Sequence, residues 1–151
     1  MNSNVDETAD ALLRVARRLR TATHAALAPL GLSPHQARAL RIIGESGPVR
    51  PSAIASRLRI APRSATEVLD ALTERGWVAR SADPDDRRAA LISLTASGRA
   101  LAERVTELRR EESERLLGVL DADALRNLAE LLRRVEGGDA WRSQSRPEGQ
   151  G

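Results

Sequence analysis

Apolar residues recur at intervals of three and four along most of the chain, the spacing that places side chains on one face of a helix. In the N-terminal part this series contains Leu12, Leu19 and Leu27, and Gly31 follows it. Glycine is common just past the end of a helix. The spacing therefore predicts one long amphipathic helix over Thr8–Leu30.

The next apolar series starts after a helix-capping signal. Ser33 offers a side-chain oxygen to the first backbone N–H groups, and Pro34 suits the first helical position. The apolar stripe that follows consists of Ala37, Leu40 and Ile43. We predict a second helix from Pro34 that ends between Gly44 and Gly47.

Two shorter helices are predicted next, over Pro51–Leu58 and Pro62–Arg75, each with its own apolar stripe. Residues 59–61 are all that separates them. Such a short connection between a short helix and a longer one is typical of a helix-turn-helix. Gly76 follows the second helix at the position where glycine commonly ends one.

Two short strands and two long helices complete the expected order. Trp77–Ser81 and Ala90–Leu94 have the pattern of a β-hairpin, which is weaker in the first strand. Thr95 then offers a cap for a helix that reaches about Leu120, and Asp121 offers a cap for a last helix.

The loop of the predicted hairpin mixes acids and bases, because Asp83, Asp85 and Asp86 precede Arg87 and Arg88. Asp83 and the proline after it suit the start of a type I turn. A carboxylate can hold a guanidinium group in a fixed direction through two parallel hydrogen bonds. We therefore expect the acids to support the hairpin and to aim the arginines, an arrangement that suits the minor groove of DNA. A solvated, charged surface turn is the simpler alternative.

Charge and composition limit the classes of function. All 24 basic residues are arginine and the net charge is only +3, so nucleic-acid binding depends on where the charge clusters. The chain has no cysteine, which excludes disulfides, thiolate zinc sites and thiol chemistry. No signal-peptide core or membrane-spanning run is present, so we expect a cytoplasmic protein without membrane contact.

We expect no enzymatic activity, no cofactor and no metal site. The sequence has no glycine-rich phosphate loop, no Ser-His-Asp order and no carboxylate pair at a suggestive spacing. Two histidines without cysteine are a thin set of ligands for a metal centre.

The stretch from Pro51 to Gly98 resembles the winged helix-turn-helix of the MarR family of bacterial transcriptional regulators. The family's wing signature has an Asp-Arg cluster before a short strand, Leu-Thr and Gly, and it is matched by DPDDRRAALISLTASG. The helix-turn-helix and first wing strand are matched by PSAIASRLRIAPRSATEVLDALTERGWVAR. The flanking helices extend the resemblance to about residues 8–136.

The resemblance implies a mainly α-helical fold in which a small β-hairpin forms a wing. Residues 32–94 would form the winged helix-turn-helix, and residues 1–31 with 95–136 the helical dimerisation region of a homodimer. The long apolar stripes of the outer helices agree, because an exposed stripe needs a partner. An ordinary coiled coil of LAERVTELRREESERLLGVL remains an alternative. Residues 137–151 form a polar, glycine-rich tail that we expect to be disordered.

The resemblance also implies a transcriptional regulator, which we expect to be a repressor, on a pseudo-palindromic DNA duplex. Polar side chains near the start of the helix over Pro62–Arg75 would then contact the major groove. These side chains are Arg63, Ser64, Thr66 and Glu67. Ser52, early in the preceding helix, suits a phosphate. The family commonly has Ser or Thr where Ala61 stands and a basic or amide residue near Glu67, so this chain departs from the pattern at both positions.

A small-molecule effector is the last partner that the resemblance implies. Members of the family usually respond to small, often aromatic ligands in a cleft between the dimer base and the winged domain. His24 and His35 are candidate polar contacts for such a ligand, and each would otherwise be an ordinary surface histidine. The alternative function is a winged-helix module that binds a protein instead of DNA.

Overall fold

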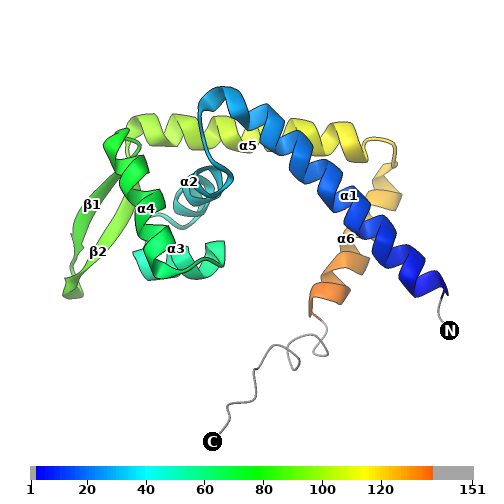
Figure 1. Ribbon diagram of the computed structural model, residues 1–151, viewed down its shortest axis with the longest axis horizontal. Coiled ribbons are helices and arrows are strands. Elements are labelled where there is room, and N and C mark those ends of the chain that lie inside the picture. The colour runs from blue at the N-terminus through cyan, green and yellow to red at the C-terminus, as the bar shows by residue number, and fades with distance from the viewer. Residues whose placement is uncertain (1–2, 138–151) are drawn as a thin grey trace, which may run out of the picture. The chain divides into compact units, whose positions relative to one another are not determined.

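The structure is a computed structural model that describes residues 3–137 of the 151-residue chain. The described part consists of six α-helices, one 3₁₀ turn and a two-stranded antiparallel sheet (Figure 1). The chain divides into two compact units, Met1–Ser113 and Glu114–Gly151. The prediction of a mainly α-helical chain with a small β-hairpin is confirmed.

The first helix, α1, runs over Ser3–Leu27, and a 3₁₀ turn, η1, follows over Ala28–Leu30. The predicted bounds of Thr8 and Leu30 are wrong at both ends. The extra first turn is polar apart from Val5, so its apolar signal is weak, although Asp6 in that turn favours the positive end of the helix dipole. At the other end, Pro29 lacks the N–H group that would continue the α-helical hydrogen bonds.

The second helix, α2, runs over Pro34–Ser46 and starts with the predicted cap. The Ser33 side chain accepts a hydrogen bond from the Gln36 N–H at 3.2 Å, and the Gln36 side chain accepts one from the Ser33 N–H at 2.9 Å. Two N–H groups that the helix leaves unpaired are thus satisfied together. The prediction from the sequence identified the serine and missed the glutamine.

The helix-turn-helix is confirmed with almost the predicted bounds. Helix α3 covers Pro51–Leu58 and helix α4 covers Pro62–Glu74, with Arg75 as the C-terminal cap of α4. Between them, Arg59 adopts the left-handed conformation, with φ of 57° and ψ of 46°. This conformation turns the chain sharply, so that α4 packs against α3.

The hairpin is longer than predicted. Strand β1 covers Val78–Asp83 and strand β2 covers Asp86–Leu94, with Val78 opposite Leu94 at the base. The expected bounds, 77–81 and 90–94, are wrong because the outer half of the ribbon is exposed apart from Asp83, so its sequence carries little alternation of polar and apolar residues. Val49 exchanges two backbone hydrogen bonds with Ile92 and thereby joins the hairpin to the segment before α3.

Helix α5 covers Ala96–Leu117, and helix α6 covers Ala122–Gly137. Both predicted caps are confirmed, since the Thr95 hydroxyl accepts from the Gly98 N–H at 3.1 Å and the Asp121 carboxylate accepts from the Ala124 N–H at 2.8 Å. Apart from Gly137, which ends α6, the tail expected to be disordered lies outside the described residues. No described helix is both long and apolar enough to span a membrane.

One continuous hydrophobic core holds α2, α3, α4, the base of the hairpin and α5 together. Side chains from all five elements are almost completely buried in it, among them Leu40, Ile54, Leu69, Ile92 and Val105. The core contains almost no aromatic residue, as the composition requires, and is filled by branched aliphatic side chains. It fixes α3, α4 and the hairpin as one body beside α2 (Figure 1).

Replacing Gly98 with alanine should destabilise the fold by at least about 3 kcal/mol, because the added methyl group would overlap the backbone carbonyl of Trp77. Gly44→Ala is the matched control. Gly44 lies inside α2, and the added methyl group would make ordinary contact with Leu94 of β2. This substitution should therefore be neutral or stabilise the fold by roughly 0.5–1 kcal/mol. Urea unfolding measures both. Equal stability of the two variants would contradict the close approach of α5 to Trp77.

Candidate nucleic-acid interface and adjoining pocket

Helix α4 buries one face and exposes the predicted contact residues on the other. Ala65 and Leu69 are in the core, whereas Arg63, Ser64, Thr66 and Glu67 are all exposed. The Arg63 side chain is 92% exposed and lies 3.5 Å from Glu67, one helical turn away. The Thr66 hydroxyl donates to the Pro62 carbonyl at 3.1 Å. Arg63 and Ser64 are therefore the side chains on this face that are most available to a ligand.

The start of α3 presents a second exposed group. Pro51 occupies the first helical position, and no side chain caps the N-terminal N–H groups. Ser52 is exposed in this first turn. Its hydroxyl and the positive end of the helix dipole together suit an anionic group such as a phosphate.

The hairpin is tied to α4 by an ion pair that the sequence did not reveal. Arg80, on β1, donates to the Asp70 carboxylate on α4 at 2.5 Å. Both side chains are partly exposed, so the pair contributes modestly to stability. Its effect is geometric, since it sets the hairpin beside the helix. A sequence pattern could not find it because the two residues belong to different elements.

The acids of the hairpin tip do support the turn, but they do not hold the arginines as predicted. Asp83 accepts a hydrogen bond from the Asp85 N–H at 2.9 Å, and Asp86 accepts one from the Arg88 N–H at 3.0 Å. The side chains of Arg87 and Arg88 form no ion pair in the part of the chain that the structure describes. Short aspartate side chains bond the nearby backbone in a turn in preference to a long, solvated guanidinium group.

The carboxylate of Asp83 instead pairs with an arginine from another element. Arg50, the residue before α3, donates from Nε at 2.8 Å and lies with its terminal nitrogen at 2.6 Å from the same Asp83 oxygen. Asp83 is only 5% exposed and is the one charged or polar residue buried in the described chain. The Asp85 N–H and the Arg50 guanidinium hold the pKa of the Asp83 carboxyl below its usual range, and the pairing raises the pKa of Arg50. The tip of the wing is thus attached to the start of α3.

These contacts bring the exposed groups to one side of the molecule. The start of α4 and the tip of the hairpin lie on the same side of the first unit (Figure 1, bottom left). A helix end and a narrow ribbon presented together could reach a major groove and the neighbouring minor groove. The geometry therefore suits a nucleic-acid duplex.

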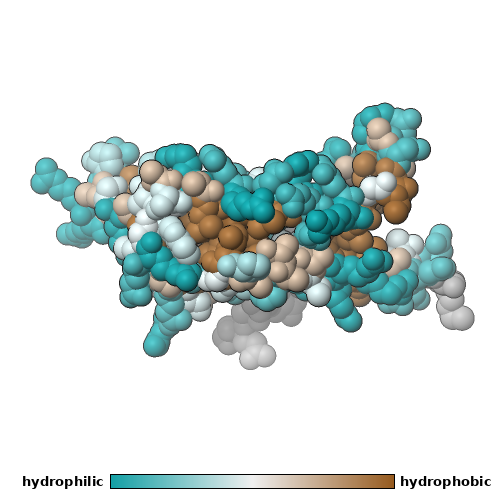
Figure 2. Space-filling view, turned by 90° about the horizontal axis from the view of Figure 1, so that it is seen from above, coloured by the Kyte–Doolittle hydropathy of each residue, from teal (hydrophilic) through white to brown (hydrophobic). Residues whose placement is uncertain are grey.

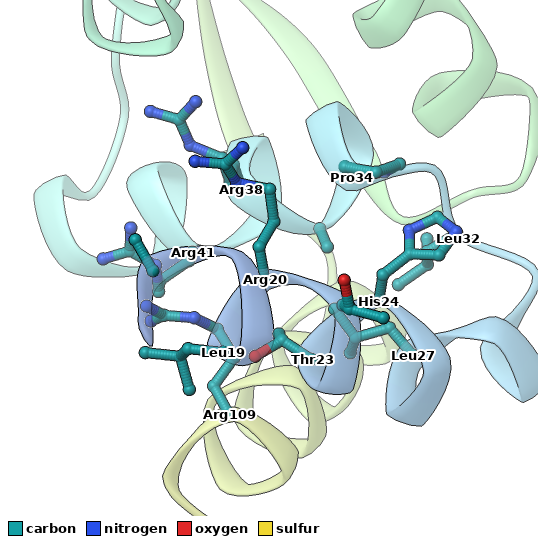
Figure 3. A pocket seen from close by; sticks show the side chains of 13 residues that line it. Leu19, Arg20, Thr23, His24, Leu27, Leu32, Pro34, Arg38, Arg41 and Arg109 are labelled. Carbon is teal, nitrogen blue, oxygen red and sulfur yellow. The ribbon is translucent and has the colours of Figure 1, made fainter. Parts of the chain in front are cut away.

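A pocket of about 570 Å³ lies on the other side of α2, between α1, α2 and α5. Apolar side chains and four arginines line it, namely Ala16, Leu19, Leu27, Leu32, Pro34, Ala37, Arg20, Arg38, Arg41 and Arg109, together with Thr21, Thr23 and His24. The arginines gather at one end of the pocket, whereas His24, Leu27 and Leu32 lie at the other (Figure 3). His35 is exposed and is not part of the lining. The pocket thus has an apolar end and a cationic end.

The cationic end lacks a matching anion. Desolvation lowers the pKa of Arg109, and the positive charges of Arg41 and Arg38 add to this effect, whereas the carboxylate of Glu45 opposes it. The Nε–H of Arg41 is buried and has no acceptor among the described residues. A buried donor without an acceptor costs free energy, so this end of the pocket favours a negatively charged ligand.

Apolar side chains are also exposed outside the core. In Figure 2 hydrophobic patches interrupt a largely hydrophilic surface. The large apolar side chains that are exposed include Val5, Leu12, Leu13 and Val15 on α1, and Leu131, Leu132 and Val135 on α6. Both helices thus have apolar faces that their own unit leaves uncovered. Within residues 3–137 no group of three or more His, Asp or Glu side chains could hold a metal ion.

Comparisons with known proteins agree with this geometry. The model of the MarR family matches residues 32–90. The HTH-type transcriptional repressor Rv2887 of Mycobacterium tuberculosis is 34% identical over 124 residues, which cover 82% of this chain and 89% of the repressor.

Solved structures of the same mycobacterial protein are similar to this chain. Its complex with DNA has a TM-score of 0.71 at 32% identity, over 86% of this chain and 97% of that one. Its complex with salicylic acid has a TM-score of 0.68 at 34% identity, over 83% and 93% of the two chains. The similarity thus extends over nearly the whole described chain.

The Arg50–Asp83 pair predicts a dependence of stability on pH. Because the pKa of Asp83 is lower in the folded state than in the unfolded chain, its contribution is complete above the unfolded value near 4. The contribution should disappear as the pH falls from there through the folded pKa. We expect Asp83→Asn to lower the melting temperature at pH 7, and the difference from wild type to shrink below pH 4.

Asp85→Asn is the matched control, since the Asp85 carboxylate forms no ion pair in the described chain. Its melting temperature should stay close to that of wild type at pH 7. Thermal unfolding followed by circular dichroism between about pH 3 and pH 7 measures all three proteins. A constant difference between Asp83→Asn and wild type across this range would contradict the assigned pair.

Proposed function

This chain belongs to the MarR family of transcriptional regulators, and from that premise we propose that it is a repressor that binds a pseudo-palindromic operator as a homodimer. The observation that carries the proposal is the joint placement of α4 and the wing. Two ion pairs, Arg50–Asp83 and Arg80–Asp70, hold the wing against α3 and α4. The exposed arginines at the wing tip therefore lie on the same side as the start of α4.

We assign α4 to the major groove and the wing to the minor groove. Arg63 and Ser64 lie closest to the start of the exposed face of α4, where side chains reach base edges. Arg87 and Arg88 follow the turn of the hairpin and have no carboxylate partner among the described residues. Arginine without a protein partner is drawn to the negative potential of a narrowed minor groove. Ser52 is assigned to the phosphate backbone.

Glu67 and Thr66 have narrower roles in this proposal. Glu67 lies near Arg63 and can accept from the amino group of cytosine, so it would restrict the sequences that α4 accepts. The Thr66 hydroxyl is already bonded to the helix backbone and would contribute through its methyl group or a phosphate contact. Discrimination among operators then depends mainly on Arg63 and Glu67.

The apolar faces of α1 and α6 are assigned to the dimer interface. Leu12 is 45% exposed and Leu131 is 54% exposed, although both are large aliphatic side chains. Covering such faces with a second copy removes apolar surface from water and gives the two-fold symmetry that a palindromic site requires. A homodimer therefore explains both the exposed faces and the form of the operator.

The pocket is assigned to a small aromatic acid that releases the DNA. The solved salicylic acid complex of the similar Rv2887 protein supports this ligand class. In this chain the apolar end would receive the ring, and the arginines at the other end would receive the carboxylate. His24 lies in the lining as a further polar contact, and His35 would act only from outside it. The regulator would be non-catalytic and would act on chromosomal DNA in the cytoplasm.

Arg88→Ala should weaken operator binding by about 1–3 kcal/mol without unfolding the protein, because a guanidinium contact to the DNA is lost. Genomic fragments bound by the purified wild-type protein would first be selected and sequenced at physiological salt. Affinity for the enriched operator would then be measured by fluorescence anisotropy for both proteins. Arg99→Ala, at the base of the hairpin on α5, is the control and should bind like wild type.

The outcomes of this selection separate the two candidate functions. An enriched palindrome that Arg88→Ala binds weakly supports the repressor. Unchanged affinity in a folded Arg88→Ala dimer would contradict the role of the wing. Failure of the folded wild-type dimer to enrich any DNA, with and without salicylate, would favour a protein-binding module instead.

Leu12→Glu should convert the dimer into monomers, because it places a charge in the apolar face of α1. Arg14→Glu is the control, since residue 14 lies on the opposite side of the same helix. Size-exclusion chromatography with light scattering distinguishes the two states. Dimeric Leu12→Glu of unchanged stability would exclude this face from the interface.

A further inference from the structure

Arg38 belongs both to the pocket and to the helix-turn-helix. Its guanidinium lines the cationic end of the pocket (Figure 3). The same group donates to two backbone carbonyls at the end of α3, to Arg57 at 3.2 Å and to Leu58 at 3.4 Å. One side chain on α2 thus contacts the place where an effector would bind and a helix that presents the DNA-binding face.

The two carbonyls need this donor. A helix leaves its last four carbonyl groups without partners inside the helix. At the end of α3 the backbone N–H groups of Arg59 and Ile60 reach the carbonyls of Ala55 and Ser56. Arg38 supplies the donors for the remaining two, and its positive charge also suits the negative end of the helix dipole. It is therefore the side-chain cap of α3.

A second route leads from the pocket to the same helix turn. Arg41, which also lines the pocket, pairs with Glu45 at 2.7 Å. The other oxygen of Glu45 lies 3.1 Å from the guanidinium of Arg57, which also donates to the Ser46 hydroxyl. The Arg41 guanidinium holds the pKa of Glu45 below its usual range. Both α2 arginines of the pocket are thus connected to the last turn of α3.

The hydrogen bonds from Arg38 are long, and their acceptors are neutral. A carboxylate is a stronger acceptor than a backbone carbonyl, because hydrogen bonds between charged groups are shorter and about twice as strong. An anion in the pocket would also reduce the repulsion among Arg38, Arg41 and Arg109. Burial, together with the charges of Arg41 and Arg38, lowers the pKa of Arg109. The ligand and the end of α3 therefore compete for the same guanidinium.

We propose that Arg38 is a positioning residue that couples the pocket to DNA binding, because it gives up its hydrogen bonds to the end of α3 when it binds the ligand. Without ligand, Arg38 caps α3 and fixes the turn at Arg59, which sets where α4 begins. With a carboxylate bound, Arg38 turns to the anion, the turn loses two hydrogen bonds, and α4 is held less firmly. This coupling rests on the proposed function, because it requires an organic anion in the pocket.

The proposal gives the two states that an allosteric mechanism requires, each with its own contacts. By linkage, DNA that selects the capped state must weaken ligand binding by the same factor by which the ligand weakens DNA binding. A neutral analogue of the ligand would fill the apolar end and leave the cap in place. The negative charge of the ligand, more than its ring, therefore determines whether Arg38 leaves the end of α3.

The test measures amide hydrogen exchange at residues 57–61 in the full-length protein, with salicylate as the probe. In wild type, saturating salicylate should speed exchange of the Arg59 and Ile60 amides several-fold, and salicylamide should not. In Arg38→Leu, exchange should already be fast without ligand and should not respond to salicylate. The three arginines that remain in the pocket should still give measurable salicylate binding by calorimetry.

Operator affinity supplies the second measurement. Salicylate should weaken operator binding several-fold in wild type, whereas Arg38→Leu should bind more weakly from the start and lose most of the response. Arg18→Leu is the control, because Arg18 is an exposed arginine of α1 that neither lines the pocket nor donates to α3 in the described chain. It should keep slow exchange without ligand and keep the response. Arg38→Lys retains the charge and replaces Arg38→Leu if that variant does not fold.

Each contrary result has one meaning. Wild-type exchange or a wild-type salicylate response in the Arg38 variant would overturn the coupling, although the pocket could still bind the effector. The same holds if salicylate weakens operator binding and leaves exchange at Arg59 unchanged. If calorimetry shows no binding of salicylate to wild type, the effector assigned under the proposed function is wrong, and the coupling is overturned with it.

Discussion

The arrangement of the winged unit depends on the ion pair between Arg50 and Asp83. A two-stranded hairpin is at best marginally stable in water, so the wing needs anchors to keep a defined position. At its base, Ile92 is buried in the core and pairs with Val49. Near its tip, Arg50 pairs with the buried Asp83, and removal of either partner would leave the other without compensation. The distance between the wing tip and the start of α3 is set by this contact.

Arginine serves two separate purposes in the winged unit of a chain without lysine. Arg50 and Arg80 are paired with carboxylates and hold elements together, whereas Arg87 and Arg88 remain exposed near the tip. Residues 48–90 have nearly as many acids as bases, so bulk attraction to DNA is weak. Affinity then depends on a few guanidinium groups in fixed positions, and the planar, forked guanidinium suits such a task better than an ammonium group.

Local signals in the sequence were sufficient for the helix-turn-helix, the caps at Ser33 and Thr95, and the exposed face of α4. Each depends on spacing or on a residue type with a defined backbone preference. The prediction paired Asp85 and Asp86 with Arg87 and Arg88, the nearest arginines in sequence, and it gave Asp83 a role in the turn without an ion-pair partner. The true partner is 33 residues away, and only the paired strands bring it close. The arginines of the pocket were missed for the same reason, since three helices contribute them.

Helix α2 explains how a pocket can influence a DNA-binding surface that it does not touch. Leu40 and Ile43 are almost completely buried, so α2 is fixed in the core and is a poor candidate for bending or sliding. Two of its long side chains, Arg38 and Arg41, line the pocket. Arg38 bonds the last turn of α3 directly, and Arg41 is connected to it through Glu45. Ligand binding in the pocket can therefore affect α3 because the guanidinium groups of α2 exchange partners while the helix itself stays in place. A rigid core and arginines that exchange partners are both necessary for this, because a movement of α2 itself would take up the change before it reached α3.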